Sequence, residues 1–411
     1  MFNFVEKECV CVQKRTYYWL AAGILFIAAN LRLPITMMPP LVPWLKNNLG
    51  LSTSMSGLLT TIPLIVFALL SPTIANLGIK KGNAQVLLGT LMTLVVGCYL
   101  RILPNKWFLL GATLIVGVGI SGGNVLLPAV IQEYFPHKTV ILTSLYTFTM
   151  GFIASIGTGT SAPLAQQIGL AGAMAVISLF GVAALLIWAM AVHQLPHKQA
   201  KQQVTPHNQG NSQLLKIPLT WMIIFFFGAQ SLLYYSMLTW LPVYWTNTGF
   251  STTISGLLAT IFQLCGMPLS LLTPIIARKR SGMYFISCLM GGGFGLGAIL
   301  LLVCRHNFVW NVLIAILLGV AAGASFSMCV VFFQRRTSSV IETAQISGIA
   351  QSVGYLLAAC GPVFSGMINS WTHSWIPVML IYAVIAIVMG FDGIMITNHP
   401  PLNTHQKDKI V

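Results

Sequence analysis

The chain has 411 residues, of which 56% are hydrophobic and only 7% are charged, and its mean hydropathy is +0.83. A soluble globular domain carries about 25% charged residues, so this composition excludes an ordinary soluble domain and predicts a polytopic membrane protein. The net charge of +15 would indicate nucleic-acid binding in a soluble chain. In a membrane protein it is explained by Lys and Arg in cytoplasmic loops, so we expect the lipid bilayer, and no nucleic acid, as a partner.

Twelve apolar runs of helical length follow one another along the chain and predict an all-α fold of twelve transmembrane helices. They cover roughly residues 17–46, 52–76, 84–102, 107–131, 138–168, 170–194, 217–247, 252–277, 283–303, 308–332, 340–369 and 374–397. Glycine and proline are frequent inside them, which is normal for membrane helices because neighbouring helices satisfy the freed backbone groups.

The basic residues are distributed unevenly over the connections between these runs. If both termini are cytoplasmic, four of them face outward: Lys46, Arg101, Lys106 and Arg305. Sixteen then face inward: Lys7, Lys14, Arg15, Lys80, Lys81, Lys138, Lys198, Lys201, Lys216, Arg278, Lys279, Arg280, Arg335, Arg336, Lys407 and Lys409. The positive-inside rule therefore predicts a multi-pass protein of the bacterial inner (plasma) membrane with both termini in the cytoplasm.

A polar connection from Leu195 to Lys216 separates six runs from six, and an internal repeat supports this division. Residues 50–62, GLSTSMSGLLTTI, match residues 249–261, GFSTTISGLLATI, nearly residue for residue. We predict two pseudo-symmetric six-helix bundles, 1–194 and 217–411, joined by a cytoplasmic linker, 195–216. This arrangement resembles the major facilitator superfamily.

Arg32 lies near the middle of the first run. An arginine at that depth costs roughly 2.5–3.5 kcal/mol on insertion scales, so its presence needs a reason. All six acidic residues lie in the tails or near the ends of runs, so no carboxylate is available at this depth. We expect Arg32 to face a central cavity and meet a small anion or polar substrate; the alternative is that carbonyls or aromatic rings satisfy it.

Four prolines follow Arg32 in the same run: Pro34, Pro39, Pro40 and Pro43. Each lacks a backbone donor and should bend or break the helix. Pro34, Pro39 and Pro40 are candidate gating residues next to the substrate, and packing geometry is the alternative explanation.

Further polar residues fall at mid-run positions where a cavity would lie. Gln230 and Tyr234 share a helix face because they are four positions apart. Amides also join neighbouring helices by hydrogen bonds, and tyrosines also pack as aromatic residues, so structural roles stay open. The substrate-binding candidates are Arg32, Asn124, Gln230, Tyr234, Tyr235, Gln263 and Gln351.

Three separated stretches carry a narrower resemblance. Asn30-Leu-Arg-Leu-Pro34 resembles the Asn-Leu-Arg-Pro start of the cyanate permease and 2-nitroimidazole transporter family. Residues 123–131, GNVLLPAVI, and 346–362, ISGIAQSVGYLLAACGP, are similar to its fourth and eleventh helices. The resemblance implies two six-helix bundles that move a cyanate-like or nitroimidazole-like solute by alternating access.

The motifs of other protein classes are absent from the sequence. There is no Gly-x-x-x-x-Gly-Lys-Ser/Thr motif and no soluble segment large enough for an ATPase. Cys9 and Cys11 form a lone Cys-x-Cys without further metal ligands nearby. We expect no cofactor, no metal and no enzymatic activity.

These observations predict a secondary-active or facilitative transporter of a small anionic or weakly acidic solute, working as a monomer. Acidic residues are absent from the middle of the runs, so a proton-carrying side chain is poorly supported. Uniport, exchange or movement of a protonatable substrate fits better. The alternatives are a broader drug or metabolite efflux transporter, whose substrates would not depend on Arg32, and a non-transporting membrane sensor.

Overall fold

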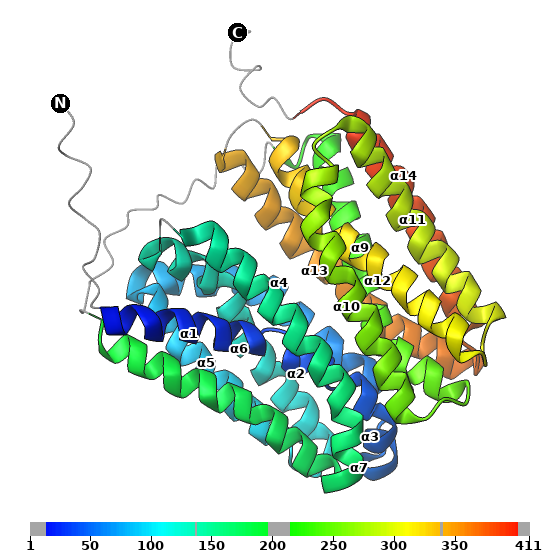
Figure 1. The fold of residues 1–411 in the computed structure, drawn as a ribbon, viewed down its shortest axis with the longest axis horizontal. Helices are drawn as coiled ribbons and strands as arrows, with labels where there is room; N and C mark the ends of the chain where they lie inside the picture. The colour runs from blue at the N-terminus through cyan, green and yellow to red at the C-terminus, as the bar shows by residue number, and fades with distance from the viewer. Residues whose placement is uncertain (1–13, 136–137, 196–213, 338–339, 402–411) are drawn as a thin grey trace.

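The computed structural model describes residues 14–135, 138–195, 214–337 and 340–401 (Figure 1). Within these ranges the structure contains helices and no strand, and eleven helical segments are long and apolar enough to cross a membrane. This confirms the predicted all-α polytopic fold. In chain order the helices are α1 (Lys14–Asn30), α2 (Leu33–Thr36), η1 (Pro39–Leu41), α3 (Val42–Leu49), α4 (Thr53–Lys81), α5 (Asn83–Leu100), α6 (Lys106–Tyr134), α7 (Thr139–His193), α9 (Pro218–Asn247), α10 (Thr252–Ile276), α11 (Arg280–Val303), α12 (Phe308–Arg335), α13 (Val340–Thr372) and α14 (Ile376–Asn398).

Helix α7 contains two of the twelve predicted runs, 138–168 and 170–194. A straight helix of its 55 residues would be about 80 Å long, far more than the roughly 30 Å of a bilayer core. Gly169 interrupts it with φ 76° and ψ 168°, a conformation that glycine adopts without steric cost. The chain reverses direction at Gly169. Two hydrogen bonds show this: the carbonyls of Ala154, before the turn, and Phe180, after it, both accept from the short stretch 30–36.

The first predicted run is broken as the prolines indicated. Helix α1 ends at Asn30, and Pro34, Pro39 and Pro43 each stand in the first turn of the next short helix. A missing N–H is tolerated at that position. The Asn30 amide donates to the carbonyls of Phe26 and Phe180 at 2.8 and 2.9 Å, and Thr36 donates to the Ala154 carbonyl at 3.1 Å. Side chains on both sides of the break therefore bond to carbonyls of α7 and hold the broken segment against that helix.

Helices α1–α7 and α9–α14 form two groups, which we call the N-terminal and C-terminal groups (Figure 1). Two clusters of buried apolar side chains lie almost wholly within residues 20–195, and a third lies almost wholly within residues 214–396. The domain boundaries at 194 and 217 stay a prediction, because residues 196–213 lie outside the described part of the chain.

The two groups meet at one end of the molecule, which we call the contact end. Here α4 and α10 begin and α9 and α13 end. Figure 1 shows the groups converging near α3 and diverging toward the ends at which α1 begins and α14 ends. Hydrogen bonds that join the groups gather toward the contact end: Ser54 to Ser370 (3.4 Å), Thr239 to Thr60 (2.8 Å), Thr61 to the Ala359 carbonyl (2.7 Å), Thr260 to the Ser155 carbonyl (3.1 Å) and Gln166 to Thr252 (3.1 Å).

Candidate functional site

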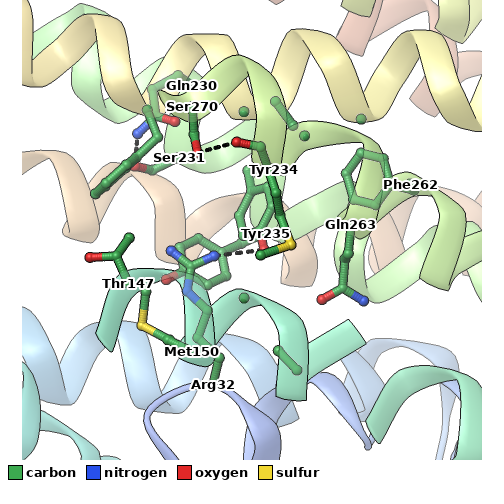
Figure 2. Close-up of a pocket in the computed structure, with 18 of the residues that line it drawn as sticks. Arg32, Thr147, Met150, Gln230, Ser231, Tyr234, Tyr235, Phe262, Gln263 and Ser270 are labelled. Atoms are coloured by element: carbon green, nitrogen blue, oxygen red, sulfur yellow. Dashed lines mark hydrogen bonds between the residues drawn. The ribbon is translucent and has the colours of Figure 1, made fainter. Parts of the chain in front are cut away.

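A cavity of about 120 Å³ lies between the two groups (Figure 2). The N-terminal group contributes Arg32 and one face of α7, and the C-terminal group contributes residues of α9, α10, α12 and α13. The apolar lining includes Phe148, Met150, Phe262, Met267 and Phe326. The polar lining consists of Arg32, Thr147, Gln230, Ser231, Tyr234, Tyr235, Gln263, Ser270 and Tyr355.

Arg32 occupies the break between α1 and α2. It is the N-cap of α2, with φ −124° and ψ −30°, and is therefore outside regular helix. Its Nη1 donates to the Tyr234 hydroxyl at 2.7 Å, and its Cζ lies 5.1 Å from the centroid of the Tyr234 ring. Figure 2 shows the guanidinium pointing across the cavity toward Tyr234 and Tyr235. Arg32 of the N-terminal group thus reaches a set of aromatic rings in the C-terminal group, formed by Tyr234, Tyr235, Phe262 and Tyr355, which we call the aromatic wall.

The aromatic wall holds Tyr234 in place. Its ring stacks on Phe262 at 6.1 Å and meets Tyr235 edge-on at 5.2 Å. Tyr235 in turn contacts Tyr355 at 6.5 Å, and Tyr355 contacts Phe227 at 5.2 Å. These centroid distances are those of favourable aromatic pairs, so the hydroxyl that faces Arg32 has a fixed position.

The cationic site has no acidic neighbour among the side chains that the structure describes. The described acidic side chains are Glu133, which accepts from Asn83 at 3.2 Å, and Asp392, which is buried on α14. Neither lines the cavity. A guanidinium has five N–H donors, and the described structure uses one of them on a neutral hydroxyl. The remaining donors and the positive charge are available to a ligand.

Five of the seven predicted substrate-binding residues line this cavity: Arg32, Gln230, Tyr234, Tyr235 and Gln263. Gln230 donates to Ser231 at 2.6 Å and accepts from Ser325 at 3.4 Å, so it also joins α9 to α12. Gln263 donates to Thr158 at 2.7 Å and so joins α10 to α7. Whether they bind substrate stays a prediction.

The other two candidates lie away from this cavity. Asn124 is exposed on α6, and Gln351 is exposed on α13, where it donates to Ser347 one turn away at 2.8 Å. Pro34, Pro39 and Pro40 are buried at the starts of α2 and η1, and their gating role stays a prediction.

The prediction omitted four polar residues of the lining: Thr147, Ser231, Ser270 and Tyr355. Ser231 directly follows Gln230, and Tyr355 is an aromatic residue in the middle of its run, so both had a weak signal. Thr147 and Ser270 resemble the many serines and threonines that bond to a carbonyl within their own helix, as both do here. Nothing in their sequence context distinguishes them.

Arg101, expected on the outward side at the end of the run 84–102, directly follows the last residue of α5 and is buried. It is 3% exposed. Its Nη1 donates to the Pro34 carbonyl at 2.6 Å and its Nε donates to Thr113 at 3.1 Å, while Nη2 is buried without a hydrogen-bond partner. Arg101 therefore holds α2, the short helix that starts directly after Arg32, through the Pro34 carbonyl.

Two groups of membrane helices with a cavity between them, lined by apolar side chains and a few polar ones, are the arrangement of a membrane transport protein. The sequence profile of the Major Facilitator Superfamily matches residues 20–359, and the chain belongs to this superfamily. The resemblance predicted from three short stretches is confirmed by related proteins. The chain is 34% identical to the 2-nitroimidazole transporter of Escherichia coli over 91% of its length and 94% of that protein. It is 25% identical to the cyanate transport protein of Escherichia coli over 86% of its length and 90% of that protein.

Solved structures show the same fold at low sequence identity. A bacterial homologue of the human lysosomal transporter Spinster matches with a TM-score of 0.76 and 12% identity, over 94% of this chain and 98% of that one. A D-xylose–proton symporter matches with a TM-score of 0.76 and 14% identity, over 94% and 100%. The chain is therefore a multi-pass membrane transporter with a small-molecule substrate, and not an enzyme.

Proposed function

We propose that the protein moves a small anionic or weakly acidic solute across the membrane by alternating access, with Arg32 as the charged contact. The observation that carries this proposal is the Arg32 guanidinium, which lies in the cavity between the two groups with a tyrosine hydroxyl, and no described carboxylate, as its partner. A positive charge inside the membrane is costly, and a bound anion would offset that cost by neutralising the charge.

The shape of the site supports a small planar ligand. A guanidinium offers a flat pair of donors that matches carboxylate-like groups, and aromatic rings can stack on a planar ligand beside it. The cavity volume of about 120 Å³ is below the roughly 300–1,000 Å³ that holds a drug-sized ligand. The two relatives named above transport cyanate, a small anion, and 2-nitroimidazole, a planar heterocycle. These observations favour a small solute over a broad range of amphipathic drugs.

The cavity lining that the structure describes contains no acidic residue, so we propose that transport proceeds by uniport, exchange or movement of a protonatable substrate. Protonation of a carboxylate in the cavity is not part of this scheme. We place the protein in the bacterial inner (plasma) membrane with cytoplasmic termini, because of the distribution of Lys and Arg, and we propose that it works as a monomer.

The test is uptake and counterflow in proteoliposomes with cyanate, nitrate and 2-nitroimidazole as probes. We expect Arg32→Gln to lower kcat/KM at least 10-fold for every transported probe, because a hydrogen bond to a charged group contributes about 1.5–3 kcal/mol. Arg32→Lys keeps the charge and loses the planar fork, so it should fall between. Lys80→Gln, which changes an exposed cation at the end of α4, should transport normally.

The alternatives give different results in the same assay. An efflux transporter for amphipathic drugs would transport apolar substrates equally well with Arg32→Gln. A sensor would transport nothing in wild-type form. If Arg32→Gln elutes as a folded monomer and transports every probe at the wild-type rate, the proposal is wrong.

A further inference from the structure

A second and larger cavity, of about 640 Å³, opens at the contact end. We call it the contact-end vestibule. Both helix groups line it: Lys46 of α3 and Thr53 of α4 come from the N-terminal group, and Arg305 and His373, which lie in the connections before α12 and α14, come from the C-terminal group. The vestibule therefore lies over the seam at which the two groups meet.

The vestibule has a positive charge that its own lining does not neutralise. Lys46 and Arg305 are both cationic at neutral pH, and the described lining contains no aspartate or glutamate. Acidic residues are rare throughout this chain, six in 411, so a distant carboxylate contributes little compensating field. Lys46 and Arg305, with the His373 imidazole nearby, line one concave surface. A concave surface with charge of one sign raises the local concentration of ions of the opposite sign, here anions.

The cations also have hydrogen-bond donors to spare. The Lys46 ammonium donates to the Thr53 hydroxyl at 2.8 Å, and the Arg305 Nε donates to the Leu302 carbonyl at 3.0 Å. An ammonium has three donors and a guanidinium five. In the part of the chain that the structure describes, the terminal nitrogens of Arg305 have no hydrogen-bond acceptor. The hydroxyl of Ser52 and the amide of Asn247 stand on the same walls, so an oxyanion can be met by charged and neutral donors together.

We propose that the contact-end vestibule is a second anion-binding site, separate from Arg32, that takes carboxylates and other small oxyanions. The site is complete when the two groups are closed at this end, because each group supplies one of the two cations. Its affinity for anions does not depend on the function proposed above. A role as the approach site for the transported anion rests on that function.

The charge of the vestibule can be measured with a reporter cysteine. In detergent, Asn369→Cys, a change in the vestibule lining, is reacted with two methanethiosulfonate reagents, an anionic ethylsulfonate and a cationic ethyltrimethylammonium. The native cysteines are first replaced by Ser or Ala, because Cys288 and Cys360 are also exposed. We expect the anionic reagent to be favoured about 10-fold over the ratio for a free thiol in solution. Lys46→Gln with Arg305→Gln should return the ratio to within about twofold of the free thiol. The matched control is Lys106→Gln, which removes a cation at the same end but outside the lining, and it should leave the ratio unchanged.

Binding and approach are then tested separately. Nitrate, at constant ionic strength, should slow the labelling of the reporter thiol in the Asn369→Cys parent but not in the doubly neutralised variant. A ratio near that of the free thiol in the parent, or an absence of nitrate protection, overturns the site. In proteoliposomes the doubly neutralised variant should raise KM for the transported anion about 3–10-fold with kcat retained, and an unchanged KM overturns the approach role.

The Arg32→Gln variant separates this proposal from the previous one. If the vestibule keeps its reagent preference in Arg32→Gln while transport is lost, both proposals stand. If transport persists in Arg32→Gln and the preference is also kept, the proposed role of Arg32 fails and the vestibule site remains.

Discussion

At the scale of single residues, the position of Arg32 follows from the break in its own helix. Pro34 has no N–H for the Asn30 carbonyl, so α1 ends and Arg32 becomes the N-cap of a new short helix. Arg101 then holds the Pro34 carbonyl at 2.6 Å, and Tyr234 accepts from the Arg32 guanidinium on the opposite side. The cation is therefore located by its backbone and by its partner, which reduces the entropy lost when a ligand binds.

Tyr234→Phe tests the value of this partner. The ring and its stacking on Phe262 remain, but the guanidinium loses its fixed acceptor, so we expect KM for a transported anion to rise about 3–10-fold, on the order of 1 kcal/mol. Tyr284→Phe is the matched control: Tyr284 accepts from Arg280 at 3.1 Å in a similar arginine–tyrosine pair outside the cavity. Equal effects of the two changes would show that Tyr234 has no special role.

Arg101→Met tests the support behind Arg32. The substitution keeps an extended side chain but leaves the Pro34 carbonyl without its donor, and an unsatisfied buried acceptor costs about 1–3 kcal/mol. We expect a lower midpoint of thermal unfolding in detergent together with a higher KM for the transported anion. Thr113→Val removes the other hydrogen bond to Arg101 and should cause a smaller change in the same direction. An Arg101→Met protein with wild-type stability and KM would rule out the supporting role.

At the scale of helices, close approach through glycine shapes the cavity wall. A Cβ atom on Gly323 of α12 would lie 1.8 Å from the Gly266 carbonyl oxygen of α10, and one on Gly319 would lie 2.2 Å from the Phe262 carbonyl oxygen. Backbones this close exclude any side chain between them. This close contact between α10 and α12 places Phe262 and Gln263 at the cavity edge. A similar close approach occurs between α11 and α14, where a Cβ atom on Gly291 would lie 3.0 Å from the Gly390 Cα atom.

Gly323→Ala should therefore destabilise the protein by about 1–3 kcal/mol, the usual effect of overpacking, because the obstructing atom belongs to backbone. Gly292→Ala is the control: a Cβ atom there meets nothing within 4 Å, and alanine is the better helix former by about 0.5–1 kcal/mol. Thermal unfolding in detergent should move in opposite directions for the two variants. A Gly323→Ala protein as stable as wild type would mean that α10 and α12 can separate freely.

The sequence predicts these helices well and their rotations poorly. Apolar length predicts the membrane segments, and proline and glycine predict where the first run breaks and where close contacts fall. In lipid, however, the outer and inner faces of a helix are both apolar. The hydrophobic pattern therefore does not distinguish the exposed Asn124 from the cavity-lining Gln230. It also does not predict that Tyr355 faces the cavity. Arg101 stands at the outer end of its run, where a charge is normally solvated; its buried partners, Pro34 and Thr113, are brought to it by tertiary packing.

At the scale of the whole molecule, the seam between the helix groups is polar where they touch. Hydroxyl–hydroxyl and hydroxyl–carbonyl bonds join α4 to α13 and α9 to α4. Such bonds can be exchanged for water one at a time, while Leu238, Ala358 and Ala359 add apolar contacts to the N-terminal group. A contact of this kind suits a protein whose two halves separate at one end and close at the other during each transport cycle.

A disulfide across this seam should stop transport. The hydroxyl oxygens of Ser54 and Ser370 lie 3.4 Å apart and belong to different groups, so Ser54→Cys with Ser370→Cys has suitable geometry for a cross-link. We expect oxidation to abolish counterflow in proteoliposomes and dithiothreitol to restore it. The control pair, Ser71→Cys with Ser121→Cys, has the same 3.4 Å separation but joins α4 to α6 within one group, and its oxidation should leave transport intact. If the oxidised Ser54→Cys, Ser370→Cys protein instead transports as fast as the same protein after reduction by dithiothreitol, the contact end need not open. In that case alternating access between these two groups is wrong for this protein.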